Sequence, residues 1–472
     1  MAMPSRRMIL SLIFIGFVLF VLGVLVWYFS PAFFGPSTQD GDSGRGGGIN
    51  LFPFGDSGGE GDQGAGGQVV DQGDTDTQDK EQDLGRMPRL RMVSKGPVIA
   101  ATMSQASSHS GIVGPSATST NDAGIENSIR YVELGTGHIY EASTFNRDIT
   151  RLSNTTIPRI NEAQFVTLDR ILMRYTDDLG NYKLFSAELA DNASPSASTP
   201  KRLQGIFLPD GVRYIDVSPE GKLVWLQNMS NGVRVVTTNA LGENQKQIYS
   251  SPLSEWRIGW YGSNNEVLLQ STPSYESYGM AYTLDASNGS LRPYGEARKA
   301  LGVLPTPDRK RALVSLKADG QTRLFLWRQE SNEYVDLTPR TFVEKCVYAS
   351  VRDEFYCASP ISPIARAEPD LWYQGVSSYR DDIWVIDGQT GASELALSPS
   401  GLSDDPIDII DLAISPDEQF LYFRDKDTRS LWTFQIDYIR GSTESSNSSE
   451  VESASEPDSG LDADTDEEPF FE

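Results

Sequence analysis

Histidine and cysteine are scarce in this chain. Its 472 residues include two histidines, His109 and His138, and two cysteines, Cys346 and Cys357. Zinc and haem sites and most histidine-based acid–base catalysis depend on these residue types. We therefore expect neither a metal site nor another cofactor.

Positive charge is also in short supply. The chain has 40 Lys and Arg against 65 Asp and Glu, which gives a formal net charge of −25. Such an acidic surface repels the phosphate backbone of DNA and RNA. Nucleic-acid binding is therefore not expected.

Two long stretches contain few apolar residues. Residues 30–88 are rich in Gly, Asp, Gln and Ser, and residues 441–472 contain eleven acids and no Lys or Arg. Such segments cannot bury enough apolar surface to offset the entropy lost on ordering. They are predicted to be a disordered linker and a disordered acidic tail on either side of a folded domain at 89–440.

A single long apolar run stands at the N-terminus. Met8–Phe29 is 22 residues without a charge, and Arg6 and Arg7 precede it. This length spans a bilayer, and no small-residue cleavage site follows. Because positive flanks stay cytoplasmic, residues 1–29 are predicted to be an uncleaved signal anchor. The rest of the chain would lie outside the cytoplasm, in a periplasm or at the cell surface.

A polar turn recurs through the folded domain. It is written Ser218-Pro219-Glu220-Gly221, Thr306-Pro307-Asp308-Arg309 and Ser415-Pro416-Asp417-Glu418, with degenerate copies at 262 and 350. The first four copies start 44 residues apart, and the last step is longer by 21 residues. A period of roughly 40–45 residues with about four short strands is typical of propeller blades.

Counting the blades predicts an all-β, seven-bladed β-propeller. Five blades carry the turns above, one surrounds Thr167–Arg170, and one is built from Ile129–Leu152. The last blade has three strands before the tail, so the strand-like run Arg89–Ser94 would complete it. Such a seam removes exposed sheet edges.

The Ser-Pro-Asp-type turns resemble the repeats of TolB-type, WD-like propellers. The resemblance covers Arg89 to Tyr438 and implies a fold rather than an activity. In that family the propeller is usually a binding platform, and related propellers are gating lids of prolyl peptidases.

The two cysteines are predicted to face each other. If Val351 and Arg352 form the turn of a hairpin, Cys346 lies directly opposite Cys357 on the neighbouring strand. In an oxidising compartment this pair would form a disulfide. The alternative is two reduced, buried thiols.

The candidate binding residues lie in two unusual loops, Ser271–Tyr278 and the 21-residue excess around Ser359–Asp381. Aromatic and Arg side chains in long loops are enriched at binding hot spots. The candidates are Tyr275, Tyr278, Trp372, Tyr373, Tyr379 and Arg380. The alternative is that they pack locally over the channel mouth.

These features favour a membrane-anchored propeller that acts as a protein-interaction or scaffold module of the cell envelope, with an unknown envelope protein or glycan as partner. One alternative is a hydrolase or lyase that uses carboxylates and tyrosines at the channel mouth, which would require several acids to converge there. A second alternative is a sensor of glycans or small ligands.

Overall fold

The computed structural model describes residues 88–105, 127–144, 146–190, 200–261, 265–403 and 406–436. The predicted anchor, nearly all of the predicted linker and the acidic tail lie outside these ranges. Among the described residues, no helix has the length and apolar character needed to cross a membrane.

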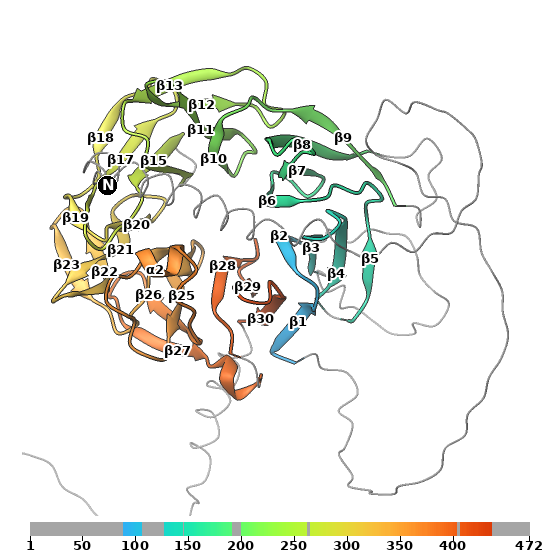
Figure 1. Cartoon of the computed structure of the whole chain (residues 1–472). Coiled ribbons are helices and arrows are strands. Elements are labelled where there is room, and N and C mark those ends of the chain that lie inside the picture. The colour runs from blue at the N-terminus through green and yellow to red at the C-terminus, as the bar shows by residue number, and fades with distance from the viewer. Residues whose placement is uncertain are drawn as a thin grey trace, which may run out of the picture. The chain divides into compact units, whose positions relative to one another are not determined.

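The described residues form seven four-stranded antiparallel sheets, arranged as blades around a centre (Figure 1). The predicted all-β, seven-bladed propeller is therefore confirmed. The first four blades are β2(Val98–Gln105), β3(Asn127–Glu133), β4(Ile139–Ser143) and β5(Ile149–Arg151); β6(Ile160–Phe165), β7(Arg170–Thr176), β8(Tyr182–Ala190) and β9(Arg202–Phe207); β10(Val212–Val217), β11(Leu223–Met229), β12(Gly232–Thr238) and β13(Lys246–Ser251); and β14(Trp256–Trp260), β15(Glu266–Ser271), β17(Ala281–Asp285) and β18(Leu291–Pro293).

The fifth to seventh blades follow in the same pattern, with a few short added elements. They are β20(Gly302–Pro305), β21(Arg311–Ala318), β22(Gln321–Arg328) and β23(Glu333–Asp336); β24(Cys346–Ala349), β25(Glu354–Pro360), β26(Asp381–Asp387) and β27(Ser393–Leu397); and β28(Ile409–Ile414), β29(Phe420–Asp425), β30(Leu431–Gln435) and β1(Leu90–Ser94). The added elements are the two-stranded ribbon β16(Tyr278–Gly279) with β19(Arg298–Lys299), the helix α2(Asp370–Tyr373), and the 3₁₀ turns η2(Val343–Lys345) and η3(Pro399–Gly401).

The seam of the ring lies in the seventh blade. Its strand order is β1-β30-β29-β28, so the N-terminal strand supplies the outer edge. Leu90 pairs with Phe434, and Met92 pairs with Trp432. The strand β1 thus completes the last blade, as the sequence predicted, and the next strand, β2, begins the first blade. The two ends of the propeller are therefore joined by backbone pairing.

The repeated turn joins the first and second strands of five blades. Its fourth residue has a left-handed backbone, with φ between 53° and 79°, at Gly221, Asn265, Arg309, Asp353 and Glu418. The degenerate copy at Ser350–Asp353 therefore has the same left-handed position as the clear copies. Only the first of these residues is a glycine, so the remaining blades hold an L side chain in a conformation that such residues rarely adopt.

The first residue of the turn stabilises it from within. The Ser218 hydroxyl accepts a hydrogen bond from the Lys222 amide at 3.0 Å, and the Ser415 hydroxyl accepts one from the Phe420 amide at 2.9 Å. Thr306 donates to the Asp308 carboxylate at 2.6 Å. The turn thus satisfies its own polar groups, which explains why Ser or Thr recurs at this position.

The hydrophobic core is divided among the contacts between neighbouring blades. Leu313 and Leu326 of the fifth blade pack with Phe355 and Ile386 of the sixth. Similar clusters join the sixth to the seventh blade and the seventh to the first. On β25, for example, Phe355 and Cys357 face the fifth blade whereas Tyr356 and Ala358 face the seventh, as the period-two pattern requires.

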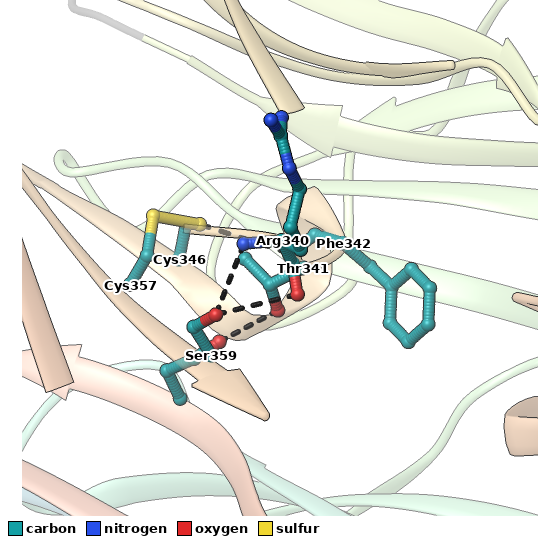
Figure 2. Close-up of a disulfide and its surroundings, with 7 residues drawn as sticks. Arg340, Thr341, Phe342, Cys346, Cys357 and Ser359 are labelled. Carbon is teal, nitrogen blue, oxygen red and sulfur yellow. Dashed lines mark hydrogen bonds between the residues drawn. A yellow bond between two sulfur atoms is a disulfide. The ribbon is translucent and has the colours of Figure 1, made fainter. Parts of the chain in front are cut away.

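Cys346 and Cys357 are directly opposite each other on β24 and β25, and a disulfide joins their sulfur atoms. Figure 2 shows this bond beside the segment that enters the sixth blade. There the Arg340 amide donates to the Ser359 hydroxyl at 3.1 Å, and the Thr341 hydroxyl donates to the Ala358 carbonyl at 2.6 Å. The disulfide and these hydrogen bonds fix the open end of the hairpin, away from the turn at Ser350–Asp353.

We predict that protein isolated without reductant contains no reactive thiol. After unfolding, an alkylating reagent should modify Cys346 and Cys357 only if the protein has first been reduced. Because the sulfurs close a short loop with a sequence separation of 11, reduction should lower the free energy of unfolding by about 2–3 kcal/mol. The Cys346→Ala/Cys357→Ala variant should be insensitive to reductant. Alkylation of both thiols without reduction would contradict the prediction.

Candidate functional site

Strand order gives the propeller two different faces. The repeated turns lie on one, here called the turn face. The loops between second and third strands and the links between blades lie on the other, here called the loop face. Both candidate loops belong to the loop face: one joins β15 to β17, and the other is the insertion 361–380 between β25 and β26, which contains α2 (Figure 1).

The two candidate loops touch each other. The Tyr275 amide donates to the Asp370 carboxylate at 2.6 Å, and the Tyr275 hydroxyl donates to the Gly320 carbonyl at 2.8 Å. The Lys317 ammonium lies 3.4 Å from the centre of the Tyr275 ring. The loops of the fourth and sixth blades therefore form one continuous surface that also contacts the fifth.

Tyr278 and Arg380 lie at the outside of this surface. Tyr278 is 69% exposed, and the Lys299 ammonium is 5.7 Å from the centre of its ring. Arg380 is exposed at the end of the insertion. Of the predicted binding residues, these two have the side chains most open to solvent.

Trp372 is packed against the propeller. Its ring centre is 5.7 Å from that of Phe342, and its indole nitrogen donates to Asp408 at 3.2 Å. The ammonium groups of Lys345 and Lys426 lie 5.3 and 4.9 Å from its ring centre. Trp372 thus covers charged groups below it and leaves little ring surface for a partner.

The two neighbouring tyrosines also have internal partners. Arg257 lies 4.4 Å from the centre of the Tyr373 ring, and the Tyr373 hydroxyl bonds to Glu344. The Tyr379 hydroxyl donates to Glu368 at 2.7 Å. Burial, followed by the nearby Glu344, raises the pKa of Tyr373 well above its usual value. Burial and the hydrogen bond to Glu368 raise the pKa of Tyr379 to about 12.

Below Trp372 lies a buried ion cluster that was not predicted from the sequence. The Lys345 ammonium is 2.5 Å from one oxygen of Asp381 and 2.5 Å from one oxygen of Asp408, and all three side chains are fully buried. Lys426 approaches Asp408 at 3.7 Å. Lys345 and Asp408 lie in links between blades, and the repeated turn gives no information about the residues in these links. Asp381 ends the 21-residue excess, which is the one feature that could have pointed to it.

Asp408 connects the insertion to the rest of the propeller. One of its oxygens accepts hydrogen bonds from the Trp372 indole at 3.2 Å, the Ser378 hydroxyl at 3.2 Å and the Tyr379 amide at 3.1 Å. Its other oxygen binds Lys345. In the described residues, no group of three or more His, Cys, Asp or Glu side chains is arranged to hold a metal ion.

A pocket of about 440 Å³ opens where the two loops meet. It is lined by Glu255, Ser271, Thr272, Pro273, Ser274, Ser277, Tyr278, Asp370, Tyr373 and Gln374. This volume is within the range of small-ligand pockets. The pocket is the open cavity beside the predicted binding residues, whereas the ion cluster is closed.

No protein-family model and no curated protein matches the chain. Similar solved structures include TolB from Acinetobacter baumannii, with 11% identity and a TM-score of 0.37 over 66% of this chain and 76% of that one. An oligogalacturonate lyase in complex with manganese shows 11% identity and a TM-score of 0.46 over 66% and 86% of the two chains. A puromycin hydrolase mutant shows 11% identity and a TM-score of 0.41 over 63% and 48%.

The chain folds as a seven-bladed β-propeller, and its repeated turns resemble those of TolB-type propellers. This assignment rests on the strand order and the repeated turns described above. Likenesses at these identities and scores carry no conclusion about activity. The function is therefore argued below from the residues of this chain.

We predict that Lys345→Met destabilises the protein by about 3–5 kcal/mol, because it leaves Asp381 and Asp408 buried without their shared counter-ion. Urea unfolding measures the change. Lys310 is an exposed lysine in the repeated turn of the fifth blade. The matched variant Lys310→Met should stay within about 0.5 kcal/mol of the wild type. Equal stability of the two variants would show that the cluster does not hold the fold together.

The pH dependence of stability should report on Asp381. Burial raises the pKa of Asp381 to about 6, although Lys345 opposes the shift. Its unfolded pKa is about 3.9, so between these values the folded state holds the extra proton, and stability falls as pH rises. The free energy of unfolding is measured for the wild type and for Asp381→Asn. The wild-type value minus the variant value should decrease by about 3 kcal/mol from below pH 4 to above pH 6. A constant difference across this range, measured by urea unfolding, would contradict the prediction.

Proposed function

We propose that this protein is a binding module of the cell envelope that recognises a protein partner through its loop face. The observation that carries the proposal is the unequal distribution of exposed apolar side chains. Among the described residues, fifteen large hydrophobic side chains are exposed. Nine of them lie in or beside the loops and links of the loop face: Leu179, Tyr182, Phe207, Met229, Leu253, Tyr278, Ile361, Val376 and Leu402.

In the part of the chain that the structure describes, the turn face has far fewer such residues. Of the same fifteen, Ile149, Leu241 and Val351 lie in or beside its turns. Apolar residues on a rim of polar loops mark surfaces that bind other proteins. Because exposed ion pairs contribute at most about 1 kcal/mol each, affinity for a partner would come mainly from such anchors.

The internal contacts of Trp372, Tyr373 and Tyr379 change the role proposed for them. These side chains hold the insertion in place, and we propose that they support the binding surface from below. Tyr278 and Arg380 remain available for direct contact. Tyr275 connects the two loops and would act as a support as well.

We place the module outside the cytoplasm, attached through the predicted anchor at Met8–Phe29. The disulfide between Cys346 and Cys357 supports this proposal, because disulfides persist in oxidising compartments. The thiol measurement described above, performed on intact cells, checks the compartment. Two free thiols in cells would favour a cytoplasmic propeller.

An enzymatic role is the second candidate, because Glu368 and two tyrosines of the insertion lie near the buried Asp381 and Asp408. Two observations disfavour it. Asp381 and Asp408 are fully buried, so a substrate has no access to them. The raised pKa values of Tyr373 and Tyr379 keep both phenols protonated, so neither suits the role of general base.

We predict that a photo-reactive residue at position 380 captures the partner in cells and that one at position 351 does not. The double variant Leu253→Ser/Val376→Ser should weaken capture from position 380 at least tenfold, because it removes two apolar anchors. Val351 is 83% exposed on the turn face, which makes Val351→Ser the matched control. Thermal unfolding should be unchanged in all variants. Equal capture by the double variant and the control would overturn the proposed binding face.

A further inference from the structure

We propose that the pocket between the two long loops binds a neutral glycan. This inference rests on the proposed role of the loop face in binding, and it adds a ligand site that shares Tyr278 with the apolar protein contacts. The argument begins with the ten residues that line the pocket. Six of them carry hydroxyl groups, two carry carboxylates and one carries an amide, and Pro273 is the remaining residue.

The lining does not match an aliphatic anchor. It contains no Leu, Ile, Val, Met or Phe, and its apolar contacts come from Pro273 and the rings of Tyr278 and Tyr373. An aliphatic side chain would desolvate the hydroxyl and carboxylate groups beside these rings without replacing their hydrogen bonds. A ligand that carries many hydroxyl groups could exchange its hydrogen bonds with water for hydrogen bonds with the pocket. A saccharide has this chemistry.

The charges of the pocket argue against an anionic ligand. Glu255 and Asp370 line it, and no Lys or Arg does. Phosphates and acidic sugars would be repelled by these two carboxylates. A hydroxyl donor would be attracted instead, because hydrogen bonds to carboxylates are stronger than those between neutral groups.

Both carboxylates are held in place by groups of the protein. Glu255 forms an ion pair with Arg213 at 3.0 Å. Asp370 accepts the hydrogen bond from the Tyr275 amide at 2.6 Å. Each carboxylate is thereby oriented and still has acceptor capacity, since an ionised carboxylate accepts about four hydrogen bonds.

Tyr278 supplies an aromatic surface at the edge of the pocket. The residue is 69% exposed, although its side chain is large and it belongs to a short paired strand. The negative face of an aromatic ring attracts polarised C–H groups, such as those on the flat face of a pyranose. A ring beside hydroxyl and carboxylate groups thus matches both the apolar and the polar side of a sugar.

The walls of the pocket are held in position before any ligand arrives. On one side, β16 pairs with β19, and Tyr275 is bonded to Gly320 and Asp370. On the other side, Tyr373 is fixed by Glu344 and by Arg257 over its ring. A preorganised site avoids part of the entropy cost of binding.

The test is calorimetric titration of the full chain in detergent with four-residue glucans and chitin fragments, a galacturonate trimer and a lysine-rich peptide. At least one of the neutral oligosaccharides should bind with a Kd of about 1 mM or tighter. Tyr278→Ala and Gln374→Ala should each weaken binding at least tenfold, and Val351→Ser should leave it unchanged. Thermal unfolding checks that each variant is folded.

Three outcomes would overturn the inference: no neutral oligosaccharide binds, the galacturonate trimer or the peptide binds instead, or binding survives both pocket substitutions. The failure of this inference can be told apart from failure of the proposed protein contact. Capture from position 380 that depends on Leu253 and Val376, without any glycan binding, would leave the loop face as a protein-binding surface alone.

Discussion

The ammonium group of Lys345 holds two buried carboxylates, and the shape of the loop face depends on this interaction. Asp381 begins β26 and Asp408 precedes β28, so Lys345 fastens the sixth blade to the seventh. Asp408 also accepts three hydrogen bonds from the insertion 361–380. Without the Lys345 ammonium, the charges of Asp381 and Asp408 would be buried without the cation that they share. Asp408 would then no longer hold the insertion in place.

The cluster determines geometry more than it adds stability. Apolar residues of similar volume are often as stabilising as a buried ion pair. Apolar residues in place of the ion cluster would not, however, hold the polar 20-residue insertion in one defined position. Hydrogen bonds to Asp408 require Trp372 and its neighbours to lie at one place, and the bond from Tyr275 to Asp370 carries that placement to the fourth blade. The pocket between the loops follows from this chain of directed contacts.

The sequence predicted the ring because the blade is a local structure. A turn such as Ser218–Gly221 and two alternating strands are specified within a few residues, and a repeat multiplies the signal. The opposed cysteines follow from one hairpin for the same reason. The ion cluster could not be predicted, because Lys345 lies 36 and 63 residues from its two partners and no repeat relates them. Amino-acid composition likewise could not show that Tyr278 is exposed whereas Trp372 packs against the propeller.

The two faces of the propeller differ for a topological reason. On the turn face, the Ser218 hydroxyl and the Asp308 carboxylate form hydrogen bonds within the repeated turn. On the loop face, each blade has a connection whose length does not affect the pairing of its strands. In the fourth and sixth blades this connection is long, and the two long connections contact each other. The residues that close the ring differ from those that form the pocket. The binding residues of the loop face can therefore change without a change in the strands of the blades.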